Sequence, residues 1–139
     1  GNTGVAQKIK ITLNSIGYLE YGFAKRLGLP MAILENKAGE FVAPSARSGQ
    51  LALAAGSEQA TEDLRIYLPD PDGADSYPIV TYTWLLAYRD YPSAETAKAV
   101  KEAVEWGLDN GQQIAEEMGY IPLPENIRQR TKEVAETIN

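Results

Sequence analysis

The chain is predicted to fold as an α/β protein. Helical and extended patterns alternate along its first part, which is typical of α/β folds rather than of all-helical or all-strand ones. Its last third carries the clearest helical periodicity. With 139 residues, 44% of them hydrophobic, it provides one ordinary domain or two partial lobes of something larger.

Caps and helix-breaking residues divide the N-terminal part into short elements. Asn2 or Thr3 is a suitable cap for the first helix, and Gly28 followed by Pro30 is a stop signal for the second. The expected elements, in chain order, are a helix over residues 5–11, a strand over 15–19, a helix over 20–27, a strand over 31–34, a turn over 37–40, an extended piece at 41–42, and a helix from Pro44 or Ser45 to Gly56.

An acidic stretch over residues 57–76 interrupts this alternation. It contains the turn-forming run Pro69 to Gly73 and one apolar island, 64–68, so we expect a loop with one short strand. Residues 77–88 are rich in β-branched and aromatic side chains and predict one or two buried strands.

The C-terminal third is predicted to be helical. Ser93 is expected to cap a helix that Asn110-Gly111 ends, and a short helix over 112–118 is expected to close at Gly119. An extended segment over 120–124 precedes a final helix over 125–138. The residues expected to face inward are Ala97, Val100, Val104 and Leu108, then Ile127, Val134 and Ile138.

Composition excludes much of enzyme chemistry. There is no cysteine and no histidine, so this chain alone builds no thiol nucleophile, zinc–thiolate site or serine–histidine triad. The net charge of −6 and the scattered arginines argue against a nucleic-acid partner. No apolar run reaches the roughly 18 residues that a membrane helix needs. We expect no enzyme activity, no cofactor and no metal.

Most chemistry-bearing motifs have a simpler structural interpretation. The run from Asp70 to Gly73 starts like a calcium loop, but Thr81 stands where such a loop needs its final glutamate, so an exposed turn is favoured. Paired glutamates lie on polar helix faces, where solvation is the ordinary role. Trp84 and Trp106 lie within or beside apolar patterns and are expected to pack in the core.

One feature is typical of anion-binding sites. Gly1-Asn2-Thr3-Gly4 precedes a helix, and free amide groups at a helix start accept a phosphate or a carboxylate. Asn2, Thr3 and Gly4 are therefore the candidate binding residues, with ordinary helix capping as the alternative.

Four segments, in one order, resemble a known family. They are SIGYLEYGFA at 15–24, LENKAGEFVAP at 34–44, YPIVTYTWLL at 77–86 and GQQIAEEMGYIPLP at 111–124. Together they are similar to the C-terminal half of the phosphate-binding protein of bacterial high-affinity phosphate ABC transporters.

The resemblance implies a partial type II periplasmic-binding-protein fold, with two incomplete α/β lobes linked by a crossing strand. Residues 1–76 would be the remainder of the second lobe. Residues 77–139 would be the return crossing, at Tyr77-Pro78-Ile79, and the C-terminal part of the first lobe. Few contacts are then expected between residues before 77 and after 80.

The resemblance also implies what is missing here. The family's main phosphate ligands precede the segment that corresponds to Gly1–Gly4, so no ligand residue is carried over. The implied partners are inorganic phosphate, when the N-terminal half is present, an ABC permease in the membrane, and either that missing half or a second copy of this chain. The implied location is periplasmic or extracytoplasmic.

Two function classes remain open at this point. One is a solute receptor present as a fragment. The other is a stand-alone interaction or regulatory module of the same fold without a ligand.

Overall fold

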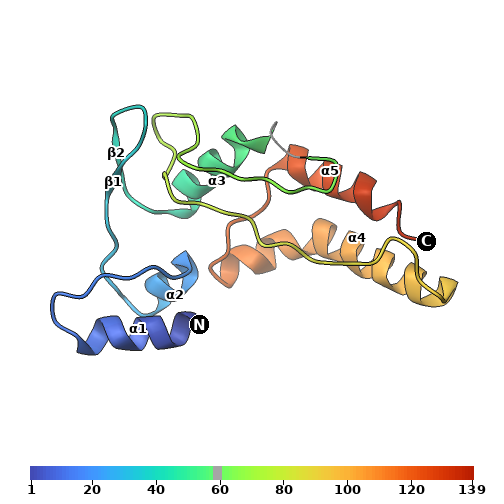
Figure 1. Ribbon diagram of the computed structural model, residues 1–139, viewed down its shortest axis with the longest axis horizontal. Coiled ribbons are helices and arrows are strands. Elements are labelled where there is room, and N and C mark those ends of the chain that lie inside the picture. The colour runs from blue at the N-terminus through green and yellow to red at the C-terminus, as the bar shows by residue number, and fades with distance from the viewer. Residues whose placement is uncertain (58–60) are drawn as a thin grey trace.

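A computed structural model describes residues 1–57 and 61–139. It is a mixed helical and strand structure, as the α/β prediction requires. The elements are α1 (Asn2–Ile11), α2 (Tyr21–Arg26), β1 (Leu34–Glu35), β2 (Phe41–Val42), α3 (Ala46–Ala55), α4 (Ala94–Glu117) and α5 (Glu125–Ala135). Figure 1 shows α1 and α2 together at one end, with the β1–β2 hairpin beyond them and α4 and α5 at the other end.

The helices begin where local capping allows. The Ser45 hydroxyl accepts the Ser48 amide proton at 3.0 Å and the Ser48 hydroxyl accepts the Ser45 amide proton at 2.9 Å, a reciprocal capping box at the start of α3. The Ser93 hydroxyl caps α4 through the amide of Thr96, as expected. The predicted cap of α1 is wrong: Gly1 is the N-cap, and Asn2 and Thr3 lie inside the helix.

Helix α4 is longer than predicted. Asn110-Gly111 does not end it, because 24 residues from Ala94 to Glu117 form one helix. The Asn110 amide donates to the carbonyl of Trp106 one turn back, and the Gln112 side chain accepts the amide proton of Leu123 at 2.8 Å. The bond from Leu123 ties this part of the helix to the segment that follows it, whereas a bond to the preceding turn, such as that of Asn110, does not by itself favour a helix. The break comes at Gly119, whose φ is +89°.

Most of the predicted strands are not formed within the described residues. Residues 15–19, 64–68 and 77–88 form neither helices nor strands, Leu64 has a φ of +61°, and the one strand-type pairing near them among the described residues is an isolated bridge between Pro69 and Ile79. The expected strand over 31–34 reduces to β1, paired antiparallel with β2. A strand exists only through a partner backbone, so an extended segment without a neighbour makes no ladder. Residues 58–60 of the predicted loop lie outside the described residues.

Two apolar clusters form the interior. The smaller one lies between α1 and α2 and consists of Ala6, Ala24 and Leu29, with Ile9 and Leu19 against them. The larger one consists of Leu53, Ile66, Leu68, Tyr82 and Ile127, with Val80, Ile121 and Leu123 against them.

The expectation of few contacts across residue 77 is wrong. The larger cluster draws on α3 and residues 66–68 from one side of the predicted crossing and on Tyr82 and α5 from the other. The Tyr82 hydroxyl also donates to the Leu53 carbonyl at 2.8 Å. The apolar face of α3 has to be covered by another element. Tyr82 and α5, which follow the predicted crossing in the sequence, cover it.

Both tryptophans are exposed, contrary to the prediction of core packing. Trp84 is 43% exposed and Trp106 is 60% exposed. Trp84 does donate a hydrogen bond to the Leu64 carbonyl at 2.9 Å. Apolar periodicity identifies the face of an element, but it does not supply the element that covers this face.

Burial raises the pKa of Tyr82 to about 12, so the fold favours its neutral phenol. The stability that depends on this group is fully present below the ordinary tyrosine pKa of about 10 and is lost as the pH rises from there toward 12. Tyr82→Phe is therefore expected to reduce the loss of stability at alkaline pH, at the cost of about 1 kcal/mol for the bond to Leu53 near neutral pH.

Urea unfolding on both sides of pH 10 measures this effect. Tyr67→Phe is the control, since Tyr67 is 82% exposed. An alkaline loss of stability that is the same in the Tyr82 variant as in the unchanged protein would contradict the assignment.

Candidate functional site

The candidate anion site is the first turn of α1. The amides of Gly4 and Val5 both donate to the Gly1 carbonyl, at 3.1 and 3.2 Å, whereas those of Asn2 and Thr3 have no protein acceptor among the described residues. The start of α1 therefore has free amide protons, as every helix start does.

The side chains there contribute little to binding. The Asn2 side-chain oxygen already accepts the amide proton of Glu20 at 3.3 Å, which ties α1 to the segment before α2. Thr3 and Gly4 are exposed. The structure thus places the three predicted residues together on one turn, with Asn2 engaged in a structural bond.

A shallow hollow of about 560 Å³ lies beside this turn. Gly1, Gly4, Val5 and Ile9 line it from α1, and Ile16 and Gly17 line it from the extended segment that follows. Gly17 allows the close approach, because a Cβ there would lie 3.0 Å from the end of the Ile9 side chain.

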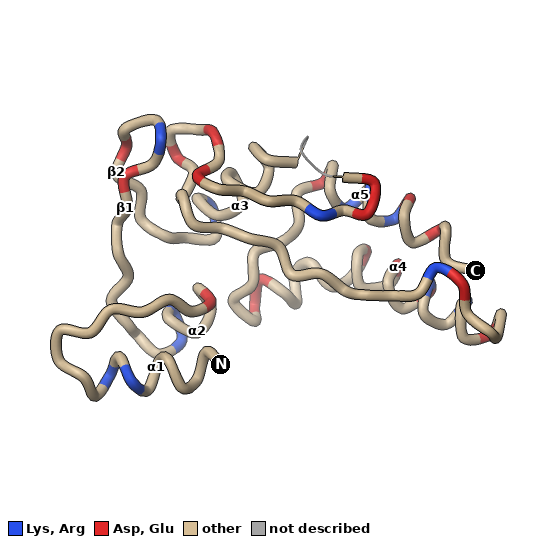
Figure 2. Tube along the Cα trace, in the orientation of Figure 1, with Lys and Arg blue, Asp and Glu red and all other residues tan. Residues whose placement is uncertain are grey.

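The hollow holds little positive charge. Lys8 is its one basic side chain, and no arginine belongs to its lining. Figure 2 shows the basic residues of α1 in the second half of the helix, and the first turn carries no charged side chain. A divalent anion removed from water needs several donors and compensating charge. The first turn of α1 therefore supplies part of a binding site at most.

Four of the six arginines make side-chain contacts elsewhere in the chain. Arg65 pairs with Asp63, and Arg128 pairs with Glu125. Arg26 donates to the Met118 carbonyl, and Arg130 donates to the Thr61 carbonyl. No group of three or more acidic residues within residues 1–57 and 61–139 is arranged to hold a metal ion. None of the helices in these ranges is both long and apolar enough to cross a lipid bilayer.

Sequence reasoning missed a buried polar residue, Asn36. It is 4% exposed, and its amide nitrogen lies 3.2, 2.8 and 3.1 Å from the carbonyl oxygens of Gly73, Ala74 and Ser76. Its side-chain oxygen accepts the amide protons of Ala38 and Glu40, each at 3.1 Å. An asparagine that opens a turn is the available signal, but the distant partners are not visible in the sequence.

Comparison with known proteins indicates which proteins this chain is similar to. No family model matches the chain. Curated relatives do: the phosphate-binding protein PstS of Pasteurella multocida is 36% identical over 130 residues, which are 94% of this chain and 38% of that protein. This chain is homologous to part of PstS.

Two further relatives agree with this assignment. PstS of Haemophilus influenzae is 33% identical over 91% of the chain, and PstS of Methanocaldococcus jannaschii is 37% identical over 91% of it. These two matches cover 38% and 36% of the relatives. The resemblance read from the four sequence segments is thus confirmed, and the chain spans less than two-fifths of the length of these curated relatives.

Proposed function

We propose that the chain is the C-terminal part of an extracytoplasmic phosphate-binding receptor that serves an ABC phosphate importer. The observation that carries the proposal is homology along more than nine-tenths of the chain to proteins named for phosphate binding. The proposal assigns no chemical reaction to the chain. It places the receptor in the periplasm or its equivalent, with a membrane permease as the partner that takes over the phosphate.

The proposed architecture is the type II periplasmic-binding-protein fold. Residues 1–76 belong to the second lobe in this proposal, and residues 77–139 form the return crossing and the end of the first lobe. Residues 15–19, 64–68 and 77–88 support this architecture, because they have the composition of strands and lack neighbouring strands among the described residues. In the complete receptor, the rest of the chain supplies these neighbours.

Exposed apolar side chains on these segments support the same proposal. Ile16 and Tyr18, which are 95% and 92% exposed, lie on one face of their segment, whereas the neighbours Leu85 and Leu86, which are 75% and 93% exposed, lie on opposite faces of theirs. Side chains of this kind on both faces of a segment are typical of a strand inside a sheet that is covered on both sides. The remainder of the receptor is the partner that covers them.

The phosphate site in this proposal is shared with residues outside this chain. The first turn of α1, with Asn2, Thr3 and Gly4, borders it and contributes backbone amides at most. The remaining donors and the charge come from the part of the receptor that these 139 residues do not include.

Equilibrium dialysis of the complete receptor chain with labelled phosphate tests the proposed function. We expect saturable binding that unlabelled phosphate displaces and that sulfate, a fully deprotonated anion near neutral pH, does not. A complete chain that retains no phosphate, or that retains phosphate and sulfate equally, would contradict the proposal.

A further inference from the structure

The C-terminal end of α1 and the turn after it carry positive charge beside exposed apolar side chains. Lys8 and Lys10 lie in the last turn of α1. Ile11, the last residue of α1, is 77% exposed, and Leu13 in the turn is 89% exposed. Figure 1 shows this turn at the left-hand end of the molecule's long axis. These four residues are called the α1 tip below.

Contacts within the chain keep the α1 tip on the outside. The Thr12 amide donates to the Lys8 carbonyl at 3.0 Å, and Asn14 has a φ of +58°, a left-handed conformation that asparagine adopts more readily than most residues. Ala6 and Ile9 of the same helix pack in the small apolar cluster. Because that face of α1 is already covered, the side chains of the α1 tip remain at the surface.

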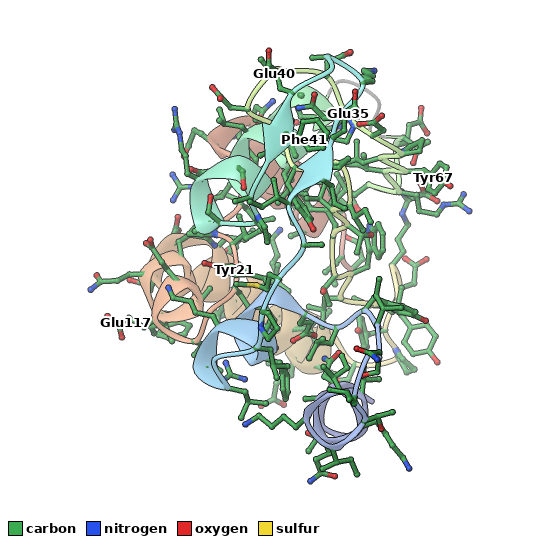
Figure 3. All side chains as sticks on the ribbon, turned by 90° about the vertical axis from the view of Figure 1, so that its left-hand side faces the viewer. Tyr21, Glu35, Glu40, Phe41, Tyr67 and Glu117 are labelled. Atoms are coloured by element: carbon green, nitrogen blue, oxygen red, sulfur yellow. The ribbon has the colours of Figure 1, made fainter. Side chains whose placement is uncertain are left out.

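The charge of the α1 tip differs from that of the rest of the chain. All nineteen acidic residues lie at position 20 or later, and the two lysines are the only charged side chains before it. Among residues 1–57 and 61–139, neither lysine pairs with a carboxylate. Figure 3 looks at the molecule from this end, with α1 seen along its axis, and the labelled Glu35 and Glu40 lie on the far side of that view. Figure 1 also separates α1 from their hairpin.

This combination fits the surface of a lipid bilayer. Anionic headgroups attract lysines, and aliphatic side chains on a protruding turn enter the boundary between headgroups and acyl chains. A protruding turn offers a protein partner no pocket to fill, whereas lipid headgroups rearrange around it.

We propose that the α1 tip contacts the anionic lipid surface of the membrane beside which the receptor works. The membrane's presence there rests on the proposed function, but the lipid contact goes beyond phosphate binding. The first turn of α1, which borders the proposed phosphate site, lies at the other end of this ten-residue helix, about 15 Å away. Lipid contact at the α1 tip therefore leaves the first turn accessible.

Sedimentation of the complete receptor chain with vesicles tests the inference. Vesicles that contain phosphatidylglycerol should bind the receptor at least about fivefold better than vesicles of phosphatidylcholine alone, and added salt should remove the difference. Lys10→Glu should lower the partition coefficient on the anionic vesicles about tenfold or more, since each unit charge near such a surface contributes about fivefold. Lys98→Glu is the matched control on α4, where Lys98 is exposed and pairs with Glu102, and it should lose less than about twofold.

Two further variants separate insertion from charge attraction alone. Leu13→Ser leaves every charge in place and should lower binding at least about fivefold, because an aliphatic side chain no longer leaves water. An environment-sensitive fluorophore on Leu13→Cys should emit at shorter wavelength with the anionic vesicles. The same fluorophore on Glu133→Cys, an exposed position of α5, should not change.

The outcomes distinguish the two proposals. A receptor that binds phosphate but does not prefer anionic vesicles, or that binds them equally with Lys10→Glu and Lys98→Glu, overturns the lipid contact and leaves the proposed function intact. Cover of the α1 tip by the rest of the receptor, or by a protein partner, would give the first of these results. A receptor that binds anionic vesicles through the α1 tip but retains no phosphate overturns the proposed function and not the lipid contact.

Discussion

Replacing Asn36 with alanine is expected to lower the free energy of unfolding by about 3 kcal/mol or more. The change removes the five hydrogen bonds that the buried Asn36 side chain makes, to the carbonyls of residues 73, 74 and 76 and with the amides of residues 38 and 40. A hydrogen bond contributes about 0.5–1.5 kcal/mol net, and five are lost at once. The damage also separates the β1–β2 hairpin from the loop before residue 77, since Asn36 joins the two.

Urea unfolding of the complete receptor chain measures this loss. Asn110→Ala is the matched control: Asn110 is exposed and donates one bond, to the carbonyl of Trp106 within its own helix, so we expect a loss below about 1 kcal/mol. Asn36→Asp keeps the acceptor and removes the donors, so hydrogen exchange at residues 73–76 should rise while the hairpin turn stays protected. Equal stability of the two alanine variants would contradict the role given to Asn36.

The isolated 139-residue chain is expected to self-associate. The segment over 80–88 has neither a neighbouring strand in the described part of the chain nor a cover for Leu85 and Leu86, which are 75% and 93% exposed. Unpaired strand backbone and exposed apolar side chains invite pairing with a second copy. Light scattering should therefore give a mass above the 15.2 kDa of one chain, increasing with concentration.

A charge on the segment should reverse this association. Leu86→Lys places an ammonium group where a second copy would pack, and lysine on an exposed strand opposes edge pairing. Ala103→Lys adds the same charge to an exposed position of α4 and should leave the mass unchanged. A monomer at every concentration, before any substitution, would show that the extended segments need no partner.

The helices could be predicted from the sequence because their causes are local. Ser45 and Ser93 cap helices as expected, and the buried positions Ala97 and Leu108 of α4 follow helical spacing. The helix end assigned at Asn110-Gly111 was wrong, and the bond between Gln112 and Leu123, which ties the helix to the following segment there, lies outside local propensity.

The strands and the polar contacts could not be predicted in the same way. Residues 77–88 have the composition of a strand, but a ladder needs a partner, and the described residues provide one bridge, between Pro69 and Ile79. The three carbonyls that bind Asn36 lie 37 to 40 residues further along the chain. The candidate site at Asn2–Gly4 was predicted from the free amide groups at the start of a helix. That argument locates free amides, but it does not show whether other hydrogen-bond donors lie close to them.

The central claim is that phosphate binding requires the part of the receptor outside these 139 residues. Isothermal titration of the isolated chain with phosphate, beside the complete chain under the same conditions, tests it most directly. The account predicts no saturable heat from the isolated chain and specific binding by the complete one, because one helix start does not offset the desolvation of a divalent anion. Saturable micromolar binding by the isolated chain, abolished by replacing Asn2 or Thr3, would contradict the account and place the site at the start of α1.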